Sequence, residues 1–437
     1  MRSKSILCLV YLFVFTMFQF CYADEASIKE ELSQLKARIQ LLENRLEEQK
    51  RSAADYEAKF KDMDEQLHRE TGVPAIKAAG LEIGAGATMI VQGTGNTNAT
   101  EEKKTGRTNA SFSEDITISK EFEGLDSKAF LHLEAGQGAG LTDELSLYSN
   151  VNYDANDEEH VSVSEIWYEQ GMFGDKALIV FGKLDPTVYF DTNEIANDET
   201  TEFLSDIFRN NPAIEFPDNS VGIRAAALPF DWLELNYGAF NTNGNWDKIS
   251  DNLLNIGQVT FKTNFFNLPG NYRFLGWQNR ADHTEWLDEE KQKEPAYGFA
   301  LSFDQKVHDI VTLFTRYGWQ DPKVFNPDMT ASGDLNYSLK HSWSAGLQIE
   351  GKPWHRENDI LAFAVGQAIP SNDYKKSFDP EIECRNEGHF EAYYKIHIND
   401  HLSISPDFQY IWNPFGKDIA DDTNGILVGG MRAQVDF

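Results

Sequence analysis

The segment that decides the fold is Gly429-Gly430-Met431-Arg432-Ala433-Gln434-Val435-Asp436-Phe437. Every second residue from Met431 to Phe437 is apolar, and the residues between them are polar or charged. This period of two predicts a β-strand with one apolar and one polar face. A final Phe437 is also typical of the assembly signal on the last strand of bacterial outer-membrane barrels, although that signal usually has Gly where Arg432 stands. A soluble β-sandwich would have little reason to end in mid-strand on Phe.

The same alternation recurs from about residue 80 onward. It is regular in five segments: 297–303, 311–319, 343–349, 390–398 and 402–412. It is weaker in nine others, near 81–91, 110–120, 128–135, 161–169, 176–183, 220–228, 232–240, 254–263 and 271–278. Because single-chain bacterial barrels have an even number of strands, we expect an all-β, transmembrane antiparallel barrel of sixteen strands.

The composition leaves two classes of β-protein open. Aromatic residues make up 13% of the chain, although its mean hydropathy is negative. A secreted soluble β-protein has such a composition, and so does a barrel with an apolar outer face and a polar lumen. Short links such as 228–231 alternate with long polar links such as 185–219, which favours the barrel. Tryptophans at segment ends then fit the interfacial belts of a membrane barrel: Trp167, Trp232, Trp277, Trp319 and Trp412.

The N-terminal part predicts export and a helical module. Residues 1–23 resemble a signal peptide, with Arg2 and Lys4 before an apolar run and cleavage expected before Asp24. Residues 24–72 are expected to form a coiled-coil helix in the periplasm, because apolar residues follow steps of four and three throughout 28–67. We expect self-association through this stripe, with a single helix lying along its own barrel as the alternative. Residues 73–80 would be a linker, and 81–437 the barrel.

Several sequence blocks resemble the carbohydrate-selective porin family, the OprB family. They include Gly182-Lys183-Leu184-Asp185-Pro186 and Ser405-Pro406-Asp407-Phe408-Gln409-Tyr410-Ile411-Trp412-Asn413-Pro414, within a resemblance that covers about residues 80–437. It implies a sixteen-stranded outer-membrane barrel that passes sugars down their gradient. The heptad segment departs from the simplest members of the family.

In a porin, selectivity comes from a narrowing that carries hydrogen-bond donors and acceptors. The segment 185–217 is long and polar, and we expect it either to shape that narrowing or to form an external solvated loop. The residues proposed to line the constriction or contact solute are Arg224, Arg432, Arg209, Asp191, Glu194, Glu165, Lys183 and Glu391. Phe437 is the expected assembly signal, and no catalytic or metal-binding residue is predicted.

The leading functional hypothesis is therefore passive diffusion of carbohydrates or similar small solutes through the outer membrane. A tether between membrane and cell wall, with a non-specific pore, is the alternative. A carbohydrate hydrolase would need a carboxylate pair in an environment that raises a pKa, and no spacing indicates one. The expected partners are outer-membrane lipid, small sugars, further copies of the chain and the cell wall. A formal net charge of −31 argues against nucleic acid, and no cofactor is expected.

Overall fold

The computed structural model describes residues 81–99, 105–122, 124–155, 160–174, 176–244, 246–288, 290–327, 330–331, 335–417 and 423–436. The predicted signal peptide, coiled coil and linker, and Phe437, lie outside the described residues. The chain divides into two compact units, Met1–Ala79 and Gly80–Phe437. The second unit is the one described below.

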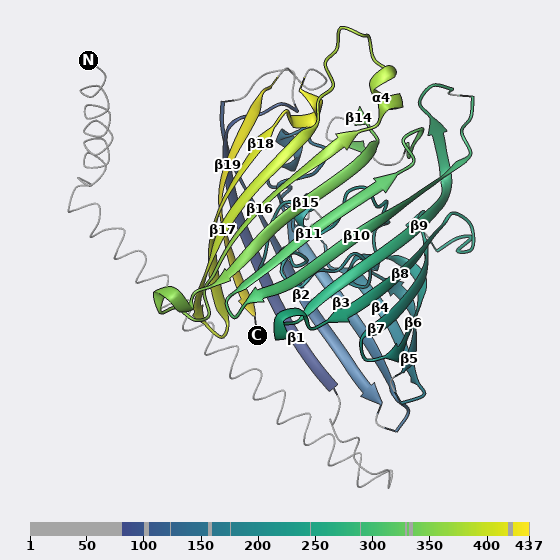
Figure 1. Cartoon of the computed structure of the whole chain (residues 1–437), viewed down its shortest axis with the longest axis vertical. Helices are drawn as coiled ribbons and strands as arrows, with labels where there is room; N and C mark the ends of the chain where they lie inside the picture. The colour runs from purple at the N-terminus through teal and green to yellow at the C-terminus, as the bar shows by residue number, and fades with distance from the viewer. Residues whose placement is uncertain are drawn as a thin grey trace, which may run out of the picture. The chain divides into compact units, whose positions relative to one another are not determined.

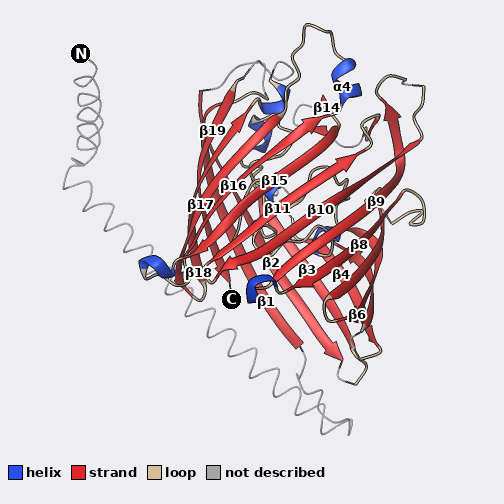
Figure 2. Cartoon of the chain, viewed as in Figure 1, coloured by secondary structure: helices blue, strands red, loops and turns tan. Residues whose placement is uncertain are grey.

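The described residues form sixteen long antiparallel strands that close into a barrel (Figures 1 and 2). The strands are β1 (Leu81–Asn96), β2 (Thr105–Phe122), β3 (Ser127–Gln137), β4 (Ser162–Met172), β5 (Ala177–Leu184), β6 (Ser220–Phe230), β7 (Leu233–Asn241), β8 (Leu253–Thr263), β9 (Gly270–Glu285), β10 (Glu294–His308), β11 (Val311–Gln320), β15 (Leu339–Glu350), β16 (Ile360–Pro370), β17 (Glu387–Asn399), β18 (Leu402–Trp412) and β19 (Gly425–Asp436). Each pairs with its neighbours in sequence, and β19 closes the barrel on β1, with Ile90 opposite Arg432. The predicted sixteen-stranded antiparallel barrel is confirmed.

The segment quoted first shows how sequence sets the two faces of the wall. Leu427 and Met431 on β19 are about half exposed on the outer face, whereas Val428 and Arg432, the residues that follow each of them, are buried on the inner face. Exposed apolar residues on one face of a closed barrel suit a hydrocarbon environment. Within the described part of the chain, no helix is long and apolar enough to cross a membrane.

One strand, β16, has no counterpart among the alternating segments of the sequence. Its inward-facing positions Ala362, Ala364 and Ala368 are buried and apolar, so residues 360–366 form an uninterrupted apolar run without alternation. The period-two rule assumes a wet lumen, and this part of the lumen is dry. The prediction that Trp277 belongs to an interfacial belt is wrong for a related reason. Trp277 is buried and packs with Phe240 and Leu275 in an apolar cluster.

Short and long links alternate around the barrel as predicted (Figure 1). β10 joins β11 through two residues, and β17 joins β18 through another two. The links between β3 and β4 and between β5 and β6 are much longer, and both return into the barrel. Helix α3 (Asp206–Arg209) belongs to the second of them, and helix α4 (Asn372–Lys376) lies in the long link after β16.

Candidate functional site

Two links fold inward and form the candidate site, the described residues 138–155 and 160–161 between β3 and β4 and residues 185–219 between β5 and β6. We call them the first and the second inner loop. Three side chains of the first lie against the barrel wall or the second loop, namely Tyr148, Asn152 and Tyr153. The second loop is bonded to strands on several sides of the barrel, as the following contacts show.

Carboxylates of β17 hold both inner loops by their backbone. Glu391 accepts hydrogen bonds from the N–H groups of Leu204 at 2.7 Å and Ser205 at 3.0 Å. Glu387 accepts from Tyr148 N at 3.0 Å and Ser149 N at 3.1 Å in the first loop. Each carboxyl group gives buried loop N–H groups an acceptor that they would otherwise lack. These two side chains therefore fix the loops to one wall.

Buried arginines hold the second inner loop from two other sides. Arg432 of β19 donates through Nη1 to the carbonyls of Glu199 at 2.6 Å and Glu202 at 2.8 Å. Arg316 of β11 donates to the carbonyls of Asp191 at 2.9 Å and Phe208 at 2.5 Å. Each arginine thus satisfies loop carbonyls that would otherwise be buried without a donor.

Apolar contacts add to these bonds. Phe203, Ile207 and Phe208 of the second inner loop pack in a buried cluster with Phe314 of β11 and Ala364 of β16. Phe203 and Phe314 have ring centroids 5.7 Å apart. Burial of large side chains contributes roughly 1.5–3 kcal/mol each, so the cluster resembles the core of a soluble domain placed inside the lumen. The second inner loop is consequently a fixed element of the barrel.

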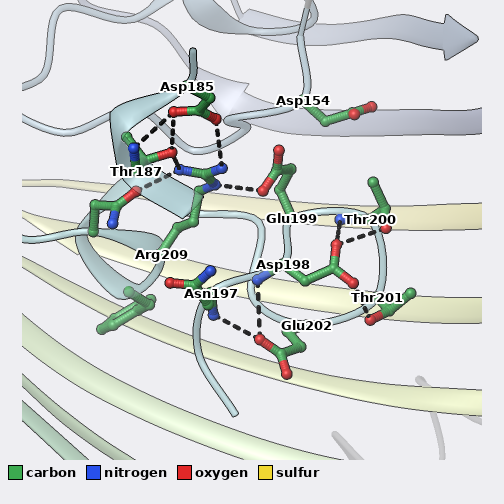
Figure 3. Close-up of polar contacts among 12 residues, drawn as sticks. Asp154, Asp185, Thr187, Asn197, Asp198, Glu199, Thr200, Thr201, Glu202 and Arg209 are labelled. Carbon is green, nitrogen blue, oxygen red and sulfur yellow. Dashed lines mark hydrogen bonds and ion pairs between the residues drawn. The ribbon is translucent and has the colours of Figure 1, made fainter. Parts of the chain in front are cut away.

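Arg209 is the centre of a polar network within the second inner loop (Figure 3). Its guanidinium forms an ion pair with Glu199, donates to Thr187 Oγ1 at 2.9 Å and lies 3.9 Å from Asp185. Glu199 and Asp185 thus approach Arg209 from two segments of the same loop. This holds together the limb of the loop that leaves β5 and the limb that returns to β6 around one cation.

A second part of the same network shapes the turn at 197–202 (Figure 3). Asp198 accepts from Thr200 N at 2.9 Å and from Thr201 Oγ1 at 2.7 Å. Glu202 accepts from the N–H groups of Asn197 at 2.6 Å and Asp198 at 3.0 Å. Local side-chain acceptors of this kind stabilise tight turns, and here they present the carbonyls of Glu199 and Glu202 to the barrel wall.

A cavity of about 580 Å³ lies between the inner loops and strands β2 to β4. Eight carboxylates line it, with His132 and Arg209 as the basic side chains and several Ser, Thr and Asn residues between them. The carboxylates belong to Asp115, Glu134, Asp154, Glu165, Asp185, Glu199, Asp206 and Asp218. Such a surface offers many hydrogen-bond acceptors and a negative potential to a solute.

Burial raises the pKa of several carboxyl groups of the second inner loop, Asp191, Glu199, Glu202 and Asp206 among them. It raises the pKa of Asp206, which lines the cavity, to about 7. It also raises the pKa of Glu202 to about 7. In both cases the lost hydration of the charged form is the largest cause, and hydrogen bonds from backbone N–H groups oppose it. The charge of the loop therefore changes near neutral pH.

Two of the predicted site residues line this cavity. They are Arg209 and Glu165, and Glu165 also accepts from Asp185 N at 3.2 Å. Lys183 of β5 does not line it: Lys183 lies opposite Ile166, which is about half exposed on the outer face, so its side chain is on the outer side of the wall, where Nζ donates to Val163 O at 2.6 Å. Arg209 and Glu165 are the part of the predicted set that the structure brings together.

The other predicted residues lie elsewhere. Glu391 and Arg432 are buried behind the second inner loop, as described above, and Asp191 is 1% exposed inside the loop. Arg224 of β6 stacks on Tyr189 at 4.6 Å from the ring centroid. Glu194 is exposed and lines a separate cavity of about 310 Å³ near the short-turn end.

Several residues of the site were missed in the sequence. Arg316 occupies a polar position of the 311–319 alternation, which is the signal that selected Arg224 and could have selected it too. His132 of β3 lies 2.7 Å from Asp115 and 3.8 Å from Glu165 in the wall of the cavity. Tyr153 follows no regular pattern, because its place depends on the fold of the first inner loop. Among the described residues, no group of His, Cys, Asp and Glu side chains is arranged to hold a metal ion.

Comparison with known families agrees with this architecture. The model of the OprB family, described as carbohydrate-selective porins, matches residues 92–437. The chain belongs to this family. No curated protein sequence matches the chain. Membership makes the barrel a porin, and the porin fold supports a channel for small solutes in the outer membrane.

Solved structures of porins share the fold. The high-pH structure of OprB from Pseudomonas putida has a TM-score of 0.67 and 18% identity, over 82% of this chain and 94% of that one. Its low-pH structure gives a TM-score of 0.51 with 14% identity, over 82% and 93%. The outer-membrane channel DcaP of Acinetobacter baumannii gives 0.50 with 10% identity, over 82% and 97%. At these identities the likeness establishes the barrel fold alone.

Proposed function

We propose that the chain is an outer-membrane porin through which carbohydrates or similar small hydrophilic solutes diffuse passively. The observation that carries the proposal is the polar cavity of about 580 Å³ between the inner loops and strands β2 to β4. Its volume lies within the roughly 300–1,000 Å³ that small-molecule sites occupy. The inner loops would then be the constriction, and the cavity the place where a solute exchanges water for protein contacts.

The groups at the cavity suit a neutral polyol. Carboxylate oxygens accept from sugar hydroxyls, while Arg209 and His132 donate to them. Arg209 itself stacks on Tyr153, which gives the cavity one aromatic component beside its polar surface. Since a porin needs binding that is weak enough to release its solute, dispersed hydrogen bonds suit the task better than one deep pocket.

Swelling of protein-containing liposomes in isosmotic sugar tests this proposal. Liposomes with the folded protein should swell in a monosaccharide much faster than in a disaccharide, because the narrow cavity retards the larger solute. Liposomes that contain heat-unfolded protein are the control. Equal rates for both sugars would contradict carbohydrate selectivity, and no swelling in either would contradict a channel.

The predicted coiled coil supports a separate proposal about assembly. Residues 28–67 keep an apolar stripe on a charged helix, and such a stripe is buried when helices associate. We propose that copies of the chain associate through this segment. Chemical cross-linking in outer membranes should yield oligomers for the full chain and monomers after deletion of 24–72. The tether alternative gains no support from the family or from the similar structures, and the barrel alone does not argue for it.

A further inference from the structure

We infer that Arg316, a buried residue of β11 outside the lining of the cavity, is the positioning residue that fixes the aperture of the pore. The inference rests on the proposed function, in which the second inner loop forms the constriction. Arg316 has no exposed side-chain surface and does not line the cavity, so a solute does not touch it. It acts through the loop segments that it holds.

The guanidinium of Arg316 joins the two limbs of the second inner loop. Nη2 donates to the carbonyl of Asp191 at 2.9 Å, and Nε lies 3.2 Å from the carboxylate of the same residue. Nη1 donates at 2.5 Å to the carbonyl of Phe208, which belongs to α3 on the returning limb. One side chain of the wall therefore sets the spacing between segments seventeen residues apart in sequence.

Asp191 is held in an unusual backbone conformation at this contact. Its φ of 58° lies in the left-handed region, which residues other than glycine adopt rarely and at a cost in free energy. Its N–H donates to Gln258 of β8 at 3.0 Å, and its carboxylate accepts from Asn211 N at 2.7 Å. The unusual backbone conformation is thus stabilised by contacts from β8, β11 and the returning limb together.

The link from Arg316 to the cavity is a single peptide unit. The carbonyl of Phe208 belongs to the peptide that continues into Arg209 N, and Arg209 lines the cavity and stacks on Tyr153. Glu199, the ion-pair partner of Arg209, is held separately through its carbonyl by Arg432. Arg316 and Arg432 therefore hold the backbone of the ion pair Arg209–Glu199 from two sides of the barrel.

The planar fork of arginine is necessary for this arrangement. Nε and Nη2 both donate to the carbonyl of Asp191, and Nη1 reaches that of Phe208 in a fixed direction, whereas a lysine ammonium is a single donor centre on a flexible stem. Loss of the fork leaves loop carbonyls buried without a donor, so the two limbs can separate. Because the loop borders the pore, such separation changes the size of the solute that can pass.

The test compares Arg316→Met with a matched control, Arg273→Met. Arg273 of β9 is also buried, but it forms its ion pair with Asp304 of β10, at 2.5 Å, and both residues belong to the wall. Liposome swelling is measured with a monosaccharide, a disaccharide and a trisaccharide, and the folded fraction is measured by heat-modifiable migration in gels. Arg316→Met is expected to raise the rate for the larger sugars relative to the monosaccharide several-fold, while Arg273→Met keeps the wild-type ratio.

An unchanged size ratio in folded Arg316→Met, or the same shift in Arg273→Met, would overturn the inference. Arg316→Lys serves as the second variant, since it keeps the charge in the site and supports folding if Arg316→Met does not fold. It should also admit larger sugars, and a wild-type ratio there would equally overturn the inference. Wild-type protein that admits no sugar would instead refute the proposed function, so the two failures are distinguishable.

Discussion

The guanidinium of Arg209 lies 4.0 Å from the centroid of the Tyr153 ring. The contact stacks the second inner loop on the first, directly at the cavity that both loops border. Cation–π contacts contribute about 0.5–2 kcal/mol, and the ion pair of Arg209 with Glu199 fixes the cation further. The two loops thus form one polar surface toward the pore.

Replacement of Arg209 should weaken sugar binding in the pore. Arg209→Met removes a donor to solute hydroxyls and about 1 kcal/mol of net hydrogen-bond energy, which corresponds to a roughly fivefold lower binding constant. The binding constant is measured from the concentration of monosaccharide that halves the single-channel current. Arg280→Met, outside the cavity, is the control, and an unaltered binding constant in Arg209→Met would exclude a contact with solute.

Ion selectivity should depend on pH. Acidic side chains outnumber basic ones in the lining of the cavity, so the channel should prefer cations, and the preference should fall between about pH 8 and about pH 6 as Asp206 binds a proton. The sign follows from its pKa of about 7: the group is mostly charged above that pH and mostly neutral below it. Reversal potentials in a salt gradient measure the preference.

Asp206→Asn separates this group from the other acids of the cavity. The variant should show a weaker cation preference at high pH and a smaller change with pH, whereas Asp218→Asn should lower the preference and keep the pH dependence. An anion-selective wild type, or an undiminished pH dependence in Asp206→Asn, would contradict the assignment.

Loss of Glu387 should release the first inner loop. The carboxylate accepts from Tyr148 N, Ser149 N and, at 2.7 Å, from Phe415 N, so Glu387→Ala leaves three N–H groups without their acceptor. Each unsatisfied buried donor costs about 1–3 kcal/mol, which favours local opening. Limited proteolysis in detergent should cut the loop faster in Glu387→Ala than in wild type. The exposed Glu383→Ala should behave as wild type, and equal protection of all three proteins would refute the anchoring role.

Gly182 of β5 should not tolerate a side chain. Its φ is 148°, and a Cβ there would lie 2.2 Å from the carbonyl oxygen of Ile166 on β4. Gly182→Ala should therefore reduce the folded, heat-modifiable fraction after refolding in detergent. Gly429→Ala on β19 is the matched control, because a Cβ there meets nothing within 4 Å. A folded fraction for Gly182→Ala as high as that of the control would disprove the close approach of β4 and β5.

The strands were predictable from sequence wherever the lumen is wet. Arg432 and Gln434 alternate with apolar residues because one face of β19 meets lipid and the other meets polar groups of the interior. β16 was not predicted, because Ala362, Ala364 and Ala368 lie in an apolar cluster with residues of the second inner loop. A local pattern cannot reveal a partner that lies about 160 residues away in the chain.

The site was predictable in outline: 185–217 was expected either to shape the narrowing or to form an external loop, and it returns into the barrel. Its residue roles depend on geometry that spacing does not contain. Arg432 and Glu391 face inward as strand alternation predicts, but they bind loop backbone, and their side chains are buried. Whether such a residue meets solute or loop is decided by how the loop folds. The solute-binding roles proposed for individual residues remain predictions.

The measurement that tests the account most directly is the block of single-channel current by sugar in planar bilayers. Purified, folded protein should open ion-conducting channels, and a monosaccharide should reduce the current in a concentration-dependent, saturable way because it occupies the cavity beside Arg209. Folded protein that conducts no ions, or a current that sugar leaves unchanged up to its solubility limit, would contradict a carbohydrate porin with its constriction at the inner loops.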